Sequence, residues 1–226
     1  MADQPQYIFG YGSLVEAESR AMTWPSAVYA SPAVVTGVQR GWFDQVTTPG
    51  YSPTYLGAVV QAGATCNGVI FSVTQQELVA YDQRETGYLR EKIDPSNITM
   101  LDGTGAAPQG DIWFYANTQQ RPASPEFPIV QSYVDVCLNG CLEIEATYPL
   151  ATRIEFEGKQ ITYSEMFIRT STDWSEWWVN DRLLPRRPFV YVPNASTIDA
   201  LIKKCLGVDP SKIELEPASW ERKSGQ

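Results

Sequence analysis

Short segments of apolar and aromatic residues, bounded by glycine, proline or serine, dominate the first half of the chain. Their enrichment in valine, isoleucine and aromatic residues is typical of strands. The predicted strands are 6–9, 33–38, 55–61, 66–73, 88–93 and 111–117. We therefore expect this half of the chain to be mostly β.

Helical patterns begin after the fourth predicted strand. Thr74-Gln75-Gln76-Glu77 fits a capping box, in which a threonine hydroxyl and a glutamate carboxylate close the first turn of a helix, and it predicts a short helix over 75–84. In the segment 129–145 the apolar residues recur at three- and four-residue spacing, which predicts a helix with one buried face. Two shorter helices are predicted at 173–184 and 196–207.

The composition predicts one globular domain. The 226 residues are 43% hydrophobic and 12% aromatic, which is enough apolar material for a buried core. Proline and glycine are dispersed rather than concentrated at a boundary. We therefore expect a single domain over 1–226, with a core over 1–145 and a C-terminal elaboration over 146–226 packed on it.

Charge and cysteine content narrow the class of partner and the compartment. Lysine and arginine total 17 against 26 acidic residues, a net charge of −9, which argues against nucleic acid as a partner. The apolar runs fall far short of the roughly 20 residues that cross a bilayer, so we expect no membrane partner. The four cysteines are too few for a disulfide framework and the N-terminus does not resemble a secretory signal. These features predict a cytoplasmic protein.

The chain contains no histidine, which excludes several kinds of mechanism at once. Ser-His-Asp triads, Cys-His pairs and histidine-ligated metals all require that residue. Acid–base chemistry must then fall to carboxylates, lysine, tyrosine or cysteine. Cys137 and Cys141 lie four apart on one predicted helical face, where packing in the core is favoured over a metal or redox pair. We expect neither a metal nor another cofactor.

Three segments carry a resemblance to a known family. Tyr7-Ile8-Phe9-Gly10-Tyr11-Gly12-Ser13-Leu14 resembles the signature loop of the γ-glutamylcyclotransferase superfamily, which includes the ChaC enzymes and the γ-glutamylamine cyclotransferases. Tyr81-Asp82-Gln83-Arg84-Glu85-Thr86-Gly87-Tyr88 is similar to the family segment in which an aspartate precedes the catalytic glutamate by three residues. Asp111-Ile112-Trp113-Phe114-Tyr115 resembles the next family strand, whose tyrosine lies near the substrate. The resemblance spans roughly residues 6–145 in the expected order.

The resemblance implies a fold, an activity and a set of site residues. The fold would be α+β, a small mixed β-barrel with flanking helices and a C-terminal elaboration. The activity would be release of 5-oxoproline from a small γ-glutamyl peptide, amino acid or amine, with Glu85 as the catalytic residue. The implied substrate-binding residues are Tyr11, Gly12, Ser13, Leu14, Tyr88 and Tyr115.

This chemistry suits a chain without histidine. The α-amino group of the γ-glutamyl unit attacks its own γ-carbonyl, so the nucleophile belongs to the substrate and one carboxylate can carry the protons. The glycines of the loop let backbone amides approach the substrate α-carboxylate. At the end of the 75–84 helix the dipole disfavours ionisation of Glu85, whereas Arg84 or Arg90 would oppose that effect.

Several alternatives remain open from the sequence. Gly10-x-Gly12 also begins a dinucleotide fingerprint, but the third glycine position holds Val15 and the pattern beyond it is rich in strands. Ser13 is favoured as a turn residue over a nucleophile, because no histidine can activate it. The aromatic rings of Tyr11, Tyr88 and Tyr115 also suit a purely structural role in a β core.

The C-terminal third offers a further candidate surface. Trp174, Trp177 and Trp178 precede Arg182, Arg186 and Arg187. This grouping is typical of a hydrophobic patch with stacked guanidinium groups, and its functional alternatives are a cover for the pocket or a homodimer contact. Two other functions stay open: a cyclotransferase acting on a γ-glutamylated biosynthetic intermediate, and a non-catalytic ligand-binding or interaction protein of the same fold.

Overall fold

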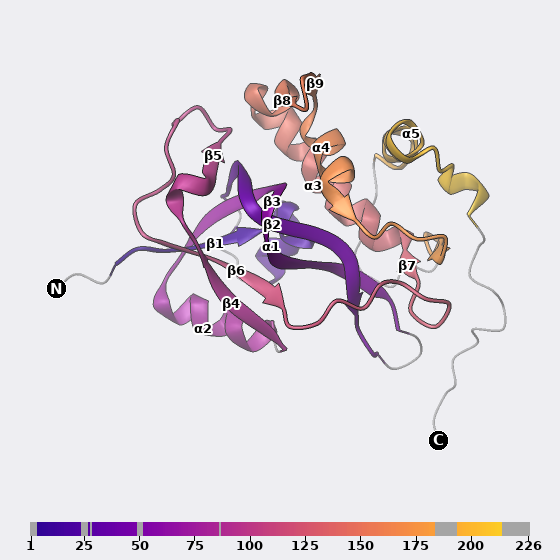
Figure 1. Ribbon diagram of the computed structural model, residues 1–226, viewed down its shortest axis with the longest axis horizontal. Helices are drawn as coiled ribbons and strands as arrows, with labels where there is room; N and C mark the ends of the chain where they lie inside the picture. The colour runs from indigo at the N-terminus through magenta and orange to yellow at the C-terminus, as the bar shows by residue number, and fades with distance from the viewer. Residues whose placement is uncertain are drawn as a thin grey trace.

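A strongly curved mixed sheet, with helices packed on its outer sides, forms the protein (Figure 1). The computed structural model describes residues 4–23, 27, 29–48, 52–85, 87–183 and 194–213. The predicted α+β class is confirmed.

The principal sheet has the order β10-β2-β3-β1-β6-β4. Its strands are β1 (Gln6–Gly10), β2 (Ser31–Gln45), β3 (Thr54–Val73), β4 (Tyr88–Ile93), β6 (Asp111–Asn117) and β10 (Ser171–Thr172). β1 runs antiparallel to β3 and parallel to β6, so it holds the centre of the sheet. The strands attached at its margins are β5 (Ile98–Met100), β7 (Ile129–Val130) and β11 (Trp178–Val179). A separate hairpin joins β8 (Ile154–Phe156) to β9 (Lys159–Ile161).

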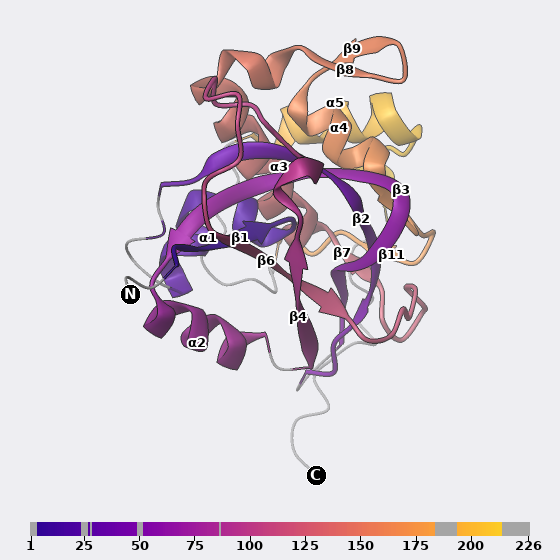
Figure 2. The same cartoon turned by 60° about the vertical axis from the view of Figure 1, so that its left-hand side comes forward.

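The two longest strands form one bent hairpin, β2–β3, which arches over the rest of the sheet (Figure 2). The sequence predicts two strands, 55–61 and 66–73, where the structure has the single strand β3. The expected break is a bulge: Thr36 faces Thr65, whereas Val38 faces Val60. Gly37 and Gly63 take φ values of +86° and +79° there, a left-handed conformation that glycine adopts without steric cost.

Five helices lie among the described residues. They are α1 (Ala17–Thr23), α2 (Gln75–Arg84), α3 (Gln131–Thr147), α4 (Tyr163–Thr170) and α5 (Ala195–Leu206). The predicted capping box is present at the start of α2, where the Thr74 hydroxyl accepts from the Glu77 amide and the Glu77 carboxylate accepts from the Thr74 amide. The sequence did not predict α1 or α4.

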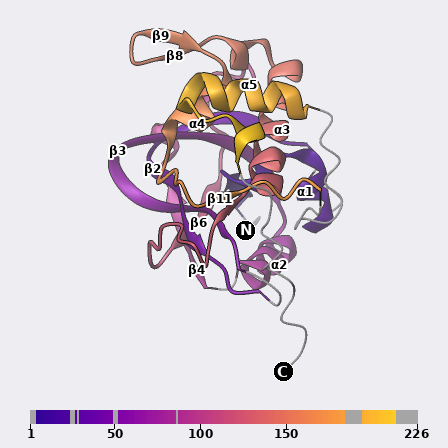
Figure 3. The same cartoon turned by 90° about the vertical axis from the view of Figure 1, so that its right-hand side faces the viewer.

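Helix α3 is buried more completely than its periodicity predicts. Every residue from 131 to 141 is buried, not one face alone. The reason is its position: α3 packs against the loop after β1, and both α4 and α5 also pack on it (Figure 3). Cys137 and Cys141 are buried there among the apolar side chains of the core, in agreement with a packing role.

The prediction of a helix at 173–184 is wrong for residues 173–183, which contain the short strand β11 instead. Trp178 and Val179 pair in parallel with Ile129 and Val130 of β7. The pairing gives the backbone N–H and C=O groups of this segment hydrogen-bond partners in β7. The spacing of apolar residues in the sequence does not reveal such a partner. Residue 184 lies outside the described part of the chain. Within that part, no helix is both long and apolar enough to span a membrane.

Candidate active site

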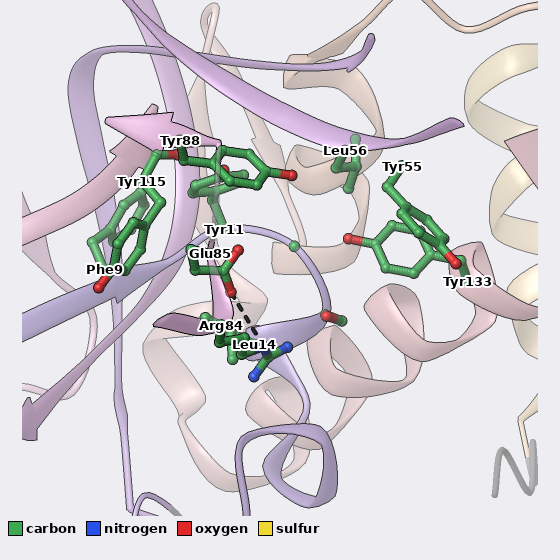
Figure 4. Close-up of a pocket in the computed structure, with 12 residues that line it drawn as sticks. Phe9, Tyr11, Leu14, Tyr55, Leu56, Arg84, Glu85, Tyr88, Tyr115 and Tyr133 are labelled. Atoms are coloured by element: carbon green, nitrogen blue, oxygen red, sulfur yellow. Dashed lines mark hydrogen bonds and ion pairs between the residues drawn. The ribbon is translucent and has the colours of Figure 1, made fainter. Parts of the chain in front are cut away.

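A cavity of about 140 Å³ opens where the loop after β1, the C-terminal end of α2 and helix α3 meet (Figure 4). Its lining residues are Phe9, Tyr11, Gly12, Ser13, Leu14, Tyr55, Leu56, Arg84, Glu85, Tyr88, Tyr115 and Tyr133. Five of these are tyrosines, and Glu85 is the one carboxylate among the lining residues.

The glycine loop forms one wall of this cavity. β1 ends at Gly10, and a single 3₁₀ turn over Ser13–Val15 follows, closed by a 3.0 Å hydrogen bond from the Val15 amide to the Gly12 carbonyl oxygen. A Cβ atom on Gly12 would lie 2.8 Å from the Tyr133 hydroxyl oxygen, so only glycine lets the loop and α3 come this close. The dinucleotide-binding alternative is excluded here, because β1 passes into this turn and pairs antiparallel with β3 rather than starting a βαβ unit.

A buried arginine that the sequence analysis missed anchors this loop. Arg40 of β2 is fully buried, and its guanidinium donates to the carbonyl oxygens of Tyr11 (3.1 Å), Asn67 (2.6 Å) and Phe167 (2.8 Å). It also donates to three neutral side chains, those of Asn67, Thr170 and Ser171. Burial lowers the pKa of Arg40. Arg40 lies beyond the strand predicted at 33–38, so no signal from the sequence marked it as buried. The structure extends that strand to Gln45 and buries the charge, which is rare unless its hydrogen bonds are satisfied.

Glu85 stands at the C-terminal end of α2. It is the C-cap residue, with φ −89° and ψ 42°, and its amide donates to the Tyr81 carbonyl oxygen at 2.9 Å. The Glu85 side chain is 20% exposed, and its Oε1 lies 3.2 Å from Nε of Arg84. Arg90 pairs with Asp82 at 2.8 Å instead. Of the two arginines considered from the sequence, Arg84 is therefore the one that contacts Glu85.

The tyrosines of the cavity are held by a hydrogen-bond network. The Tyr11 hydroxyl donates to the Tyr115 carbonyl oxygen at 2.7 Å, and the Tyr115 hydroxyl donates to Asp82 Oδ1 at 2.8 Å. The Tyr88 hydroxyl donates to Asp44. Burial raises the pKa of all three phenols, and the negative charge of Glu85 raises them further. These phenols therefore stay neutral and protonated near neutral pH, which leaves Glu85 as the carboxylate of this wall.

The structure brings together all seven site residues predicted from the sequence, since each lines this one cavity. Their individual roles stay predictions. The cavity also contains five residues that the sequence analysis did not select: Phe9, Tyr55, Leu56, Arg84 and Tyr133. Tyr133 extends from α3 toward Gly12, from the side opposite Tyr88 (Figure 4). Its helical spacing marked it for the core, and nothing local in the sequence marks it as part of a site.

The tryptophan segment supports the cavity from behind and does not line it. Trp174 stacks on Trp178 at 5.3 Å between ring centroids and packs on Trp42 at 4.9 Å. Trp42 in turn meets Tyr133 edge to face at 5.9 Å. Trp177 is 43% exposed.

The sequence pattern predicts that the guanidinium groups of this segment stack on the tryptophan rings. Arg182 instead pairs with two carboxylates. Arg182 forms ion pairs with Asp135 and Asp199, each at 2.7 Å, because a half-buried guanidinium is better satisfied by two carboxylates. Arg186 and Arg187 lie outside the described residues. Among the residues that are described, no group of three or more cysteine, aspartate or glutamate side chains is placed to hold a metal ion.

Together, the mixed sheet, the glycine loop and the carboxylate that lines the same cavity define an α+β protein with a candidate acid–base site. The family model described as "Gamma-glutamyl cyclotransferase, AIG2-like" matches residues 8–131, more than half of the chain, and the chain belongs to this family. No curated protein matches the sequence.

Solved structures with a similar arrangement have low sequence identity to this chain. One is an uncharacterized protein from Homo sapiens, 16% identical, with 73% of this chain and 96% of that chain covered and a TM-score of 0.49. A protein described as a gamma-glutamyl cyclotransferase is also 16% identical, with coverages of 72% and 96% and a TM-score of 0.49. A yeast cyclotransferase described as specific to glutathione is 13% identical, with coverages of 74% and 96% and a TM-score of 0.43.

Proposed function

We propose that this protein is an enzyme that releases 5-oxoproline from a small γ-glutamyl peptide, amino acid or amine. The observation that carries the proposal is that Glu85 and the Gly12 loop line the same cavity. This reaction requires two things of a protein: a carboxylate that carries the protons and backbone amides that position the substrate. Membership of the γ-glutamyl cyclotransferase family supports the same reaction type.

In the proposed reaction, Glu85 accepts a proton from the substrate α-ammonium group. The free amine then attacks the γ-carbonyl carbon of the same molecule and closes a five-membered lactam ring. Glu85 delivers that proton to the leaving nitrogen and takes up the second proton, which the ring nitrogen must lose to become the lactam N–H. The γ-amide C–N bond breaks, 5-oxoproline and the amine separate, and the amine takes the remaining proton from Glu85. The first amides of the Ser13–Val15 turn have no partner within the turn and suit the substrate α-carboxylate.

The proposed leaving-group wall is formed by Tyr55, Leu56 and Tyr133, on the side of the cavity across from Glu85 (Figure 4). This wall is aromatic and aliphatic. Its composition supports leaving groups that present apolar surface.

The experiment is a screen for 5-oxoproline release from glutathione, γ-glutamyl-L-alanine and ε-(γ-glutamyl)-L-lysine. We expect at least one compound to yield 5-oxoproline and its free amine in equal amounts. A free amine accompanied by glutamate would instead indicate hydrolysis. Failure of all three to react, with a correctly folded protein, would contradict the proposed function.

A further inference from the structure

Three tyrosine hydroxyls line the cavity near Glu85, those of Tyr11, Tyr88 and Tyr115. None of them donates its hydrogen bond to another of the three hydroxyls; each donates to a different acceptor in the protein. A phenol has a single O–H proton to donate and two lone pairs to accept with. Tyr11 donates its hydrogen bond to a backbone carbonyl oxygen. Tyr115 and Tyr88 donate theirs to the carboxylates of Asp82 and Asp44, respectively. Each donor is therefore already committed in the protein itself.

What these hydroxyls still offer to a ligand is their lone pairs. All three residues line the cavity with Glu85, and Figure 4 shows Tyr88 extending over Glu85 from the β4 side. Arg84 also lines the cavity, but its Nε lies 3.2 Å from Glu85 Oε1, so it is engaged with that carboxylate. The phenol oxygens beside this pair can then accept hydrogen bonds from a group that only donates. A primary ammonium group, with three N–H donors and no acceptor, is such a group.

The acceptor of the Tyr88 hydrogen bond is a buried carboxylate that is held from both sides. Asp44 of β2 is 9% exposed, and its second oxygen accepts a 2.8 Å hydrogen bond from Nδ2 of Asn117. The orientation of the Asn117 amide is fixed in turn, because its Oδ1 accepts the Ala58 backbone N–H at 2.9 Å. Gly57, which precedes Ala58 in β3, leaves room for this amide, because a Cβ atom at position 57 would overlap the Asn117 side chain.

We propose that Asp44 is a positioning residue: by accepting the hydrogen bond of the Tyr88 O–H group, it fixes that hydroxyl as a hydrogen-bond acceptor for the α-ammonium group of the substrate. This inference rests on the proposed function, since it assumes a γ-glutamyl substrate. Asp44 does not line the cavity, and both of its oxygens are occupied, so it acts through Tyr88 alone.

The substitution Asp44→Asn reverses the direction of this hydrogen bond and keeps the side-chain shape. Asn117 can only donate toward position 44, because Ala58 fixes its amide. The new asparagine must then turn its oxygen to Asn117 and its NH₂ group to Tyr88. Tyr88 would accept that hydrogen bond, and its own proton would turn toward the cavity and the substrate ammonium.

Two probes separate this effect from a general loss of structure. The first is γ-glutamyl-L-alanine, and the second is glutaryl-L-alanine, which differs by having hydrogen in place of the α-amino group. We expect Asp44→Asn to lower kcat/KM for the first by about 10- to 100-fold, the usual weight of a hydrogen bond to a charged group. The inhibition constant of glutaryl-L-alanine should stay within about twofold, since it has no ammonium to misplace.

Matched variants complete the test. Tyr88→Phe should also weaken the ammonium-bearing probe selectively, and adding Asp44→Asn to Tyr88→Phe should cause little further loss. Asp111→Asn removes a carboxylate from β6 that pairs with Lys92 outside the cavity, and it should change neither probe. Circular dichroism and thermal unfolding establish that each variant is folded.

Equal loss for both probes, or no loss for either, in a folded Asp44→Asn protein would overturn the assignment of Asp44 and leave the proposed function intact. If the unaltered protein turns over none of the three screened compounds, the proposed function fails separately. Calorimetric titration with the same two probes then decides whether Asp44 affects ammonium binding. An unchanged preference between them in Asp44→Asn would again overturn the inference.

Discussion

The guanidinium group of Arg40 donates a hydrogen bond to the carbonyl oxygen of Tyr11 at 3.1 Å, from a fully buried position in β2. This contact ties the glycine loop to the sheet, and the same guanidinium donates to the Phe167 carbonyl oxygen within α4. One side chain therefore joins the first strand's loop, the β2–β3 hairpin and a helix from the C-terminal third.

We expect Arg40→Met to destabilise the protein by about 3 kcal/mol or more, because it leaves several buried carbonyl oxygens without donors. Urea unfolding followed by circular dichroism measures the change in the free energy of unfolding. Arg153→Met, at an exposed position, is the control and should stay within about 0.5 kcal/mol. A similar small change for Arg40→Met would show that the buried network is not needed for stability.

Glu85→Gln should lower kcat by about 10²- to 10⁴-fold, because the amide keeps the shape but cannot take up the substrate proton. The measurement is 5-oxoproline release from the best compound of the screen. Glu155→Gln, at an exposed position in the β8–β9 hairpin, is the matched control and should behave like the unaltered protein. Near-normal turnover by Glu85→Gln would remove Glu85 from the role of base.

Gly12→Ala should weaken the binding of 5-oxoproline, because its Cβ atom would lie 2.8 Å from the Tyr133 hydroxyl oxygen and the loop must move from its place against the glutamyl group to make room. Calorimetric titration of the folded variant measures this affinity. Adding Tyr133→Phe removes the nearest overlapping atom, so the double variant should recover part of the lost affinity. Undiminished affinity in Gly12→Ala alone would contradict the placement of the glutamyl group against this loop.

Tyr55→Ala should change the preference among leaving groups, because Tyr55 lines the cavity and packs on Tyr133 at 4.6 Å between ring centroids. Trp177→Ala should leave that preference unchanged, since Trp177 is not among the residues that line it. The ratios of kcat/KM for the three screened compounds measure both effects. A shift in preference caused by Trp177→Ala and absent in Tyr55→Ala would reverse this assignment.

Dialysis against a chelator should leave the rate unchanged, because carboxylate acid–base chemistry needs no divalent ion. The rate of 5-oxoproline release is compared before and after dialysis. Loss of activity that one divalent ion restores would refute this prediction and would require a ligand set that the described residues do not contain.

Local patterns in the sequence were sufficient to predict helix α2 and the place of Glu85 at its end. The capping box at Thr74 and Glu77 involves groups three residues apart, so its hydrogen bonds form whenever the helix starts there. The strands β1, β4 and β6 are likewise marked by their own residues and their turn signals. The family motifs added a prediction of which segments meet at the cavity.

The far wall of the cavity and the supports behind it were decided by tertiary structure. Tyr133 reaches the loop only because α3 packs across the sheet, and Asp44 meets Tyr88 only because β2 and β4 approach in the curved sheet. Trp178 joins a strand because β7 offers it a partner, although the local pattern favoured a helix. Contacts between residues so far apart in the sequence depend on how whole helices and strands pack together. Neither a local hydrogen-bonding motif nor the spacing of apolar residues predicts them.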